Sequence, residues 1–276
     1  MTIGMTLVIG GTGKTGRRLA ERLAERGHPV RIGTRTTDPP FDWLREASWP
    51  DALEGVKSLY VTYQPDLAVP AAPAAIRALA RLARDRDIKH LVLLSGRGET
   101  EAQRCERIVQ DSGVPWTILR CSWFAQNFSE SFLLDGLLAG DLMLPAGDVG
   151  EPFVDLEDVA EVAAAALTEG GHVGQLYEIT GPRLWSFREA VAEIATMTGR
   201  EIRYSQVSMD GYTAELARLD TPPDLSWLVS YLFREVLDGR NAWIADGVQR
   251  ALGRPARDFS AYVRETAPTG VWNSAS

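Results

Sequence analysis

The sequence predicts an α/β protein with a doubly wound parallel sheet and a smaller, mostly helical C-terminal substrate lobe. Two observations lead to this fold class. Short apolar runs alternate with helical patterns through the first two thirds of the chain, a pattern typical of strands buried on both faces by helices. Three glycines at three-residue spacing follow the first apolar run, at the point where such a sheet passes from its first strand into its first helix.

The elements follow in order from these patterns. The expected strands of the sheet are Thr6–Ile9, Val30–Gly33, Ser58–Thr62, His90–Leu94 and Trp116–Leu119. The helices expected between them are Arg17–Arg26, Ala74–Arg86 and Glu99–Gln110. Because parallel strands need long crossovers, this alternation of strand and helix predicts parallel pairing.

The second part of the chain is less regular. The elements expected there are helices at Phe124–Leu138 and Leu156–Leu167, strands at Leu142–Leu144, Leu176–Thr180 and Ile202–Val207, and a helical remainder at Asp210–Ala267 broken at Pro222-Pro223. A helix is also expected at Ser186–Thr198, where Ser186 and Glu189 form a capping box and Gly199 marks the end. We therefore expect a core in residues 1–123 and a lobe in residues 124–276, intertwined because segments around 151–180 return to the sheet.

Composition excludes several classes of protein. A net charge of −8 argues against a nucleic-acid binder, and no apolar run reaches the roughly 18 residues of a membrane span. Two cysteines and three scattered histidines fit neither a disulfide framework nor a metal site nor a Ser-His-Asp triad. We expect a cytoplasmic protein with a small-molecule substrate, no nucleic-acid or membrane partner and no metal, and the sequence leaves open whether it forms a homodimer.

The glycine-rich segment carries the chemistry. Backbone N–H groups at a helix N-terminus suit a pyrophosphate, and glycine lets the backbone approach it closely. The predicted cofactor-binding residues of this loop are Gly10, Thr12, Gly13, Lys14, Thr15 and Gly16. A Walker phosphate loop is excluded, because Val8 stands where that motif needs its first glycine. An ordinary strand–helix turn is the alternative.

The end of the second strand bears on the choice of dinucleotide. An acidic residue at that position binds the ribose 2′-OH of NAD, but here no carboxylate appears before Asp38. Arg35 follows the strand instead, and a guanidinium binds a phosphate through paired charged hydrogen bonds. Lys14 could approach the same phosphate. The sequence predicts NADP(H), the alternative being that Arg35 is only a surface charge.

At this point the chain resembles the NmrA-like branch of the atypical short-chain dehydrogenases, a family with a Rossmann-like fold. The segments that carry the resemblance are Gly10-Gly11-Thr12-Gly13-Lys14-Thr15-Gly16, Leu93-Leu94-Ser95, residues 111–128 and residues 152–160. The opening is similar to ergot-alkaloid reductases that act on iminium intermediates. The later segments are equally similar to bacterial NADPH quinone reductases.

The resemblance implies a role for further residues. Phe41-Asp42-Trp43, which we interpret as a third strand, would place Asp42 and Trp43 beside the adenine. Tyr63, Gln64, Ser95 and Gly96, at two further strand ends, would line the ribose and nicotinamide. The residues expected to wall the substrate pocket are Trp123, Phe124, Asn127 and Phe128.

The sequence departs from the family in its catalytic pair. Many short-chain dehydrogenases use Tyr-x-x-x-Lys as a general acid, but residues 95–107 contain neither tyrosine nor lysine. One interpretation is a reductase of a quinone, an imine or iminium ion, or a carbonyl, with Tyr63 or Ser95 as the catalytic candidate. Another is a non-catalytic NADP(H)-sensing regulator that binds a protein partner. Epimerase-like or isomerase chemistry is a third.

Overall fold

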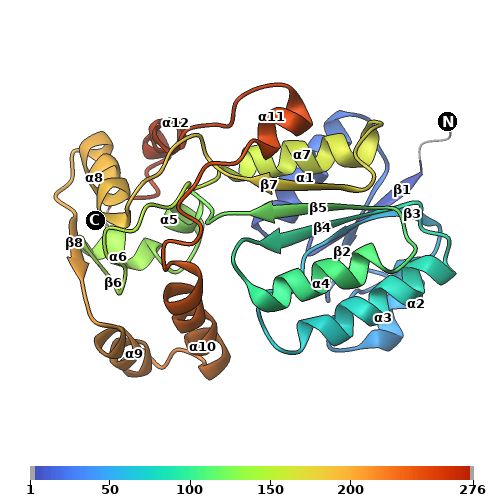
Figure 1. Cartoon of the computed structure of the whole chain (residues 1–276), viewed down its shortest axis with the longest axis horizontal. Coiled ribbons are helices and arrows are strands. Elements are labelled where there is room, and N and C mark those ends of the chain that lie inside the picture. Colours follow the sequence, from blue (N-terminus) through green and yellow to red (C-terminus); the bar gives the residue numbers. More distant parts are fainter. Residues whose placement is uncertain (1–3, 274–276) are drawn as a thin grey trace. The chain divides into compact units, whose positions relative to one another are not determined.

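The computed structural model describes residues 4–273, which form two units (Figure 1). The first unit contains the chain up to Cys121 together with Leu156–Ile179 and Asp246–Arg254. The second contains Ser122–Asp155, Thr180–Ala245 and the chain from Pro255 onward. The chain therefore passes back and forth between the units, and the expected core of residues 1–123 corresponds to the first segment of the first unit.

A parallel sheet of six strands forms the centre of the first unit, in the order β2-β1-β3-β4-β5-β7. The strands are β1 Met5–Ile9, β2 Val30–Gly33, β3 Val56–Val61, β4 His90–Gly96, β5 Trp116–Cys121 and β7 Gln175–Ile179. The strand order changes direction between β1 and β3, and ligands of such sheets bind at this switch point, outside the carboxyl ends of the strands. The predicted fold class is confirmed.

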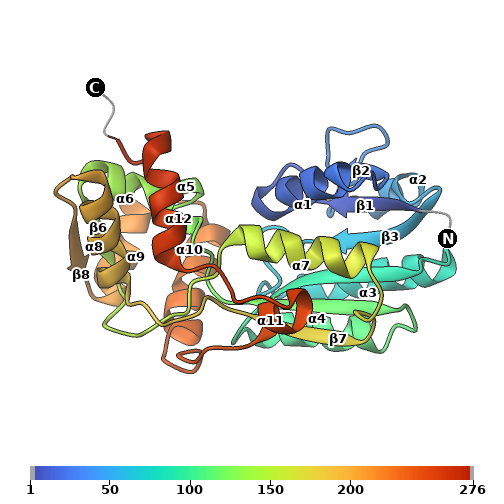
Figure 2. The ribbon, with the colours of Figure 1, turned by 90° about the horizontal axis from the view of Figure 1, so that it is seen from above.

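Helices cover both faces of this sheet (Figures 1 and 2). The helices of the first unit are α1 Lys14–Glu25, α2 Trp49–Ala52, α3 Ala72–Asp85, α4 Thr100–Gln110, α7 Leu156–Thr168 and α11 Gly247–Leu252, with a 3₁₀ turn at Glu46–Ser48. Helices α1 and α7 pack together on one face, and α3 and α4 pack together on the other. Strands enclosed in this way are apolar along their length, as Leu7, Val8 and Ile9 of β1 are.

The predicted strand at Phe41–Trp43 is wrong, since these residues lie in a loop and the sheet ends at β2. Their aromatic rings pack instead: Phe41 stacks on Trp49 with ring centroids 5.6 Å apart. The backbone groups that a ladder would need are used locally. The Asp42 N–H donates to Ser48 Oγ at 3.1 Å, and its carbonyl accepts from Trp49 Nε1 at 2.7 Å.

The second unit combines a small parallel pair of strands with short helices. Its elements are β6 Asp141–Leu144, β8 Arg203–Gln206, α5 Asn127–Glu130, α6 Leu134–Ala139, α8 Phe187–Thr198, α9 Met209–Arg218, α10 Pro223–Tyr231, a π-helical turn at Leu232–Val236, α12 Phe259–Thr266 and a 3₁₀ turn at Ala267–Thr269. The predicted capping box of α8 is confirmed: Ser186 Oγ accepts from the Glu189 N–H at 3.2 Å, and Glu189 Oε2 accepts from the Ser186 N–H at 2.7 Å.

Two predicted helices are shorter than expected. The helix predicted at Phe124–Leu138 is divided, because Ser131 is extended (φ −154°, ψ −168°) between α5 and α6. The helical remainder breaks a second time after the π-helical turn, and α11 belongs to the first unit. In residues 4–273, none of the helices has the length and apolar character needed to span a membrane.

Candidate functional site

The glycine loop joins β1 to α1 in a tight turn. Gly10 has φ +73°, which favours glycine, and the Gly13 N–H donates to its carbonyl at 2.8 Å. A Cβ atom on Gly16 would lie 2.4 Å from the same carbonyl oxygen. The turn therefore requires glycine at Gly10 and Gly16, and it brings the start of α1 against the end of β1.

The N-terminus of α1 is built to receive an anion. Its N-cap is Gly13, which has no side chain to satisfy the first N–H groups, and the first turn contains no acidic residue. The only atom near a Cβ built on Gly13 is the Gly10 carbonyl oxygen at 3.1 Å. The residues present thus fit a dinucleotide pyrophosphate. Thr12 is exposed and Lys14 half-buried, whereas Thr15 is buried.

The loop after β2 presents Arg35 to solvent. Thr37 Oγ1 accepts from the Thr34 N–H at 3.1 Å and donates to the Thr34 carbonyl at 2.9 Å, which closes a turn around Arg35. Arg35 is exposed, and within residues 4–273 its guanidinium forms no ion pair. A guanidinium in this state is available to a phosphate.

Aromatic rings lie where β3 ends. Trp43 Nε1 donates to the Thr62 carbonyl at 3.1 Å, and its ring lies 4.8 Å from that of Tyr63. Burial raises the pKa of the Tyr63 phenol. Gln64 is exposed, and Asp42 caps its own loop by accepting from the Leu44 N–H at 3.0 Å. The structure thus brings Trp43 and Tyr63 together beside the carboxyl end of β3.

Ser95, near the end of β4, is hydrogen-bonded within the protein. Its hydroxyl donates to Glu106 Oε1 at 2.6 Å, and Ser95 is only 4% exposed. In this arrangement the hydroxyl proton is directed at Glu106 rather than at a ligand. Gly96 follows Ser95 and is half-buried. The catalytic assignment of Ser95 and Tyr63 stays a prediction.

A buried ion network that sequence reasoning missed lies at the ends of β4, β5 and β7. Arg120 donates to Glu106 at 3.0 Å and to Glu178 at 2.9 Å, and Arg97 pairs with Glu178 at 3.3 Å. The hydrogen bond to Glu106 raises the pKa of Arg120. Buried charges are stable only when paired, and each of these arginines faces a carboxylate.

A second missed feature is a pair of carboxyl groups, Glu99 and Asp66. Glu99 is the N-cap residue of α4, and Asp66 follows β3 by a short loop. Burial, together with the charge of Asp66, raises the pKa of Glu99 well above its usual value. The sequence signal that could have found these residues is their position. Asp66 and Glu99 each follow one of two neighbouring strands, and the carboxyl ends of such strands meet at one edge of the sheet.

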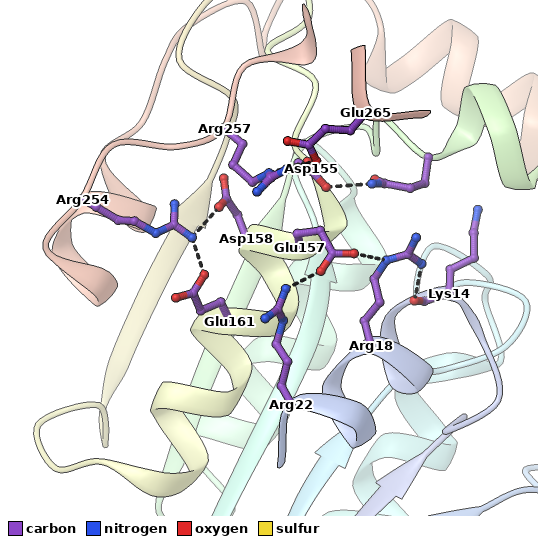
Figure 3. Close-up of polar contacts among 11 residues, drawn as sticks. Lys14, Arg18, Arg22, Asp155, Glu157, Asp158, Glu161, Arg254, Arg257 and Glu265 are labelled. Carbon is purple, nitrogen blue, oxygen red and sulfur yellow. Dashed lines mark hydrogen bonds and ion pairs between the residues drawn. The ribbon is translucent and has the colours of Figure 1, made fainter. Parts of the chain in front are cut away.

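Helix α7 holds α1 in place (Figure 3). Arg18 donates to Glu157 at 2.8 Å and also to the Lys14 carbonyl at 2.9 Å, and Arg22 forms a second ion pair with Glu157. The adjacent residue of α7, fully buried Asp158, pairs with Arg254 at 2.8 Å. The segment 152–160, noted in the sequence, thus supports the helix that follows the glycine loop.

A family model described as NAD(P)H-binding matches residues 10–170, more than half of the chain. The chain belongs to this NAD(P)H-binding family. The match covers the glycine loop, the loop of Arg35 and the ends of β3 and β4. The predicted dinucleotide-binding site therefore belongs to a family that binds NAD(P)H.

Several curated relatives of this NAD(P)H-binding protein are named as reductases or dehydrogenases. The chain is 33% identical to a (4-alkanoyl-5-oxo-2,5-dihydrofuran-3-yl)methyl phosphate reductase of Streptomyces griseus, over 95% of this chain and 98% of the relative. It is 30% identical to agroclavine dehydrogenase of Claviceps fusiformis, over 96% of this chain and 98% of the relative. These full-length matches support an NAD(P)H-dependent oxidoreductase family.

Solved structures share the fold. An NADPH-dependent quinone oxidoreductase from Escherichia coli, in complex with NADPH, matches with a TM-score of 0.77 at 23% identity, over 95% of this chain and 99% of that one. NmrA, a negative transcriptional regulator, in complex with NAD, matches with a TM-score of 0.71 at 16% identity, over 98% and 97%. These structures show that the chain shares their fold.

The residues predicted to contact the substrate lie in the second unit of this NAD(P)H-binding protein. Phe128 is fully buried in the core, with its ring 5.2 Å from that of Phe153, and Trp123 packs edge-on against Phe187 at 5.5 Å. Asn127 and Phe124 are half-buried. The role of these four residues stays a prediction, and Phe128 also packs in the core of this unit.

No cluster of three or more metal-ligating side chains occurs in the part of the chain that the structure describes.

In the second unit, the Asp155 carboxylate accepts hydrogen bonds from Gln126 at 2.7 Å and from Arg257 at 2.9 Å (Figure 3). This buried carboxylate is therefore engaged by the polar side chains around it.

Proposed function

We propose that the protein is an NADPH-dependent reductase that transfers hydride to a small organic acceptor. The observation that carries the proposal is the uncapped N-terminus of α1, which begins at glycine and has no acidic residue in its first turn. The names of the full-length relatives support a reductase or dehydrogenase rather than another kind of protein that binds a dinucleotide at this site.

Arg35 supports NADPH over NADH. Its guanidinium is exposed beyond β2, in a loop without a carboxylate until Asp38. A 2′-phosphate would receive charged hydrogen bonds from Arg35, whereas an unphosphorylated ribose would find no acidic acceptor for its 2′-OH. Bound NADPH supplies a hydride at its nicotinamide ring.

The acceptor we propose is a quinone, an imine or iminium ion, or an activated carbonyl. The segment from Ser95 to Arg107 contains no Tyr-x-x-x-Lys pair, so the usual phenol acid of short-chain dehydrogenases is missing. Acceptors that are already electron-poor need less help from a general acid. The chain then contributes mainly by positioning the acceptor against the cofactor.

The test is NADPH consumption by purified protein with a panel of quinones, iminium ions and activated carbonyls, repeated with NADH. We expect turnover with at least one class and a preference for NADPH. Tight NADPH binding without hydride transfer to any acceptor would instead favour the sensor interpretation, in which the protein binds a protein partner. Binding of neither dinucleotide would defeat both.

A further inference from the structure

The carboxyl group of Glu99 lies beside Gly96, at the carboxyl end of β4. A Cβ atom on Gly96 would lie 2.0 Å from Glu99 Oε1, so the Glu99 carboxyl group packs directly against the β4 backbone. Glu99 is 6% exposed, and its Oε2 atom has no hydrogen-bond partner within residues 4–273. The carboxyl group of Glu99 is therefore buried next to Gly96, a residue expected to line the nicotinamide. Its Oε2 atom has no hydrogen-bond partner among the described residues.

The pair holds a proton on Glu99. Two adjacent carboxyl groups in a buried site cannot both ionise. Burial raises the pKa of Glu99, and the neighbouring charge of Asp66 raises it further. Burial also raises the pKa of Asp66, and the Ala68 N–H, which donates to Asp66 Oδ1 at 2.8 Å, opposes that rise. The upward shift of the Glu99 pKa favours the protonated form of Glu99.

Other titratable and charged groups surround the pair. Those that act on Glu99, or are acted on by Glu99 or Asp66, are Glu106, Cys105 and Cys121, and Arg97 acts in turn on Cys121. Burial raises the pKa of both thiols, so the cysteines stay neutral. Glu106 is bound by Arg120 and adds to the upward shift on Glu99. A carboxylic acid is accordingly the available proton source at this end of β4.

We infer that Glu99 is the proton donor of the reduction and that Asp66 is a positioning residue that keeps the proton on it. The inference rests on the proposed function. It assigns an acid to a site where the family's tyrosine and lysine are absent, and the acid lies at the strand end where that pair would be needed.

The step balances as follows. Hydride brings two electrons to the carbon of a neutral C=O acceptor and the π pair moves to oxygen, so NADPH is oxidised and the acceptor reduced. The oxygen takes the proton of Glu99, which becomes a carboxylate. Solvent returns a proton through Asp66, which is more exposed than Glu99. A cationic acceptor, by contrast, becomes neutral on receiving hydride and needs no proton.

The first experiment compares Glu99→Gln with Glu101→Gln, a matched control in the first turn of α4. Single-turnover rates are measured with a quinone and with an iminium ion. Glu99→Gln should lower the quinone rate by about 10²-fold or more and leave the iminium rate within about threefold. The control should change neither. Equal losses for both acceptors, or no loss with the quinone, would overturn the assignment.

The second experiment measures the pH profile of quinone reduction in Asp66→Asn. Removing the charge of Asp66 lowers the pKa of Glu99, so the pH above which the rate falls should move down. The iminium rate should show no such limb. An unchanged profile would show that Asp66 does not hold the proton on Glu99.

A readout without cofactor completes the test. Infrared difference spectra of wild type against Glu99→Gln at neutral pH should contain the band of a protonated carboxyl group, and its absence would overturn the inference. If wild type binds NADPH and reduces neither acceptor, the proposed function fails and the donor role fails with it. If wild type reduces both and Glu99→Gln does so equally well, only the donor role fails.

Discussion

Arg18 Nε lies 2.8 Å from Glu157 Oε1 and joins the two helices that cover one face of the sheet. Arg18 belongs to α1, which starts at the glycine loop, and Glu157 opens α7 more than a hundred residues later. The same arginine also donates to the Lys14 carbonyl in the first turn of α1. The orientation of the anion-binding helix terminus is therefore fixed partly from α7.

Glu157→Gln should weaken this link. Burial of Glu157 would raise its pKa, but hydrogen bonds from Arg18 and Arg22 outweigh it and hold the pKa low. A lowered folded-state pKa stabilises the fold above the unfolded value of about 4.3, and the stabilisation is lost as pH falls through the folded value. We expect the variant to unfold about 1 kcal/mol more easily at pH 7, a modest figure because the pair is partly exposed.

The check is chemical denaturation of wild type and Glu157→Gln at pH 7 and below pH 4, with tryptophan fluorescence as the probe. The difference between the two proteins should shrink at the lower pH, as the carboxyl group of Glu157 takes up a proton in the folded chain. A difference that stays constant with pH would mean that the carboxylate charge contributes nothing.

Arg35→Ala should weaken NADPH binding by about 1.5–3 kcal/mol, the range for a hydrogen bond to a charged group. NADH binding should hardly change, since NADH lacks the 2′-phosphate. Titration of both dinucleotides by calorimetry measures this. Arg45→Ala, which removes another exposed arginine of the same loop, is the control and should alter neither affinity. Equal losses for NADPH and NADH in Arg35→Ala would defeat the assignment.

Gly13→Val should abolish dinucleotide binding and leave a folded protein. The backbone at Gly13 is extended (φ −77°) and tolerates a side chain, but a branched Cβ would fill the space where the pyrophosphate approaches. Circular dichroism and cofactor titration separate the two effects. Gly16→Ala is a useful contrast, because its Cβ would meet the Gly10 carbonyl at 2.4 Å and should disturb the loop itself. Normal dinucleotide binding by a folded Gly13→Val variant would show that the loop is only a turn and does not bind the pyrophosphate.

Tyr63→Phe separates the tyrosine from the buried acid. The ring of Tyr63 packs on Trp43, and its pKa is raised by burial. With Glu99 as donor, Tyr63→Phe should change quinone and ketone reduction by less than about threefold, whereas a donating phenol would cost about 10²-fold or more. Steady-state rates with both acceptors decide. A loss of that size with both acceptors would assign the proton to Tyr63.

Sequence periodicity located most strands because they are enclosed by helices and apolar along their length, as Leu7, Val8 and Ile9 of β1 are. It also located the half-buried edge strand β2, which Val30–Gly33 matches at both ends. It failed at Phe41–Trp43, where aromatic residues resemble a strand but pack on Trp49 in a loop. It also missed the interruption at Ser131, since a change of backbone direction within an apolar stretch leaves no period to detect.

The glycine loop and Arg35 could be predicted because the residues that indicate each of them are close together in the sequence. The pair formed by Asp66 and Glu99 could not, because the two residues are separated by the whole of α3 and β4. Nor could the partner of Asp158, which is Arg254, near the end of the chain. Contacts of this kind depend on which strand ends the fold brings together, and one sequence does not reveal them.

The last segment of the first unit has a consequence for how the protein is made. Gly247 opens α11 so close to β7 that a Cβ atom would lie 2.1 Å from the Glu178 carbonyl, and Arg254 neutralises Asp158 within the same unit. A ribosome must therefore synthesise Arg254 before the dinucleotide-binding unit is complete. Until then Asp158 has no arginine to pair with, so a nascent chain ending before α11 should be a poor binder of nucleotide and a good substrate for proteases.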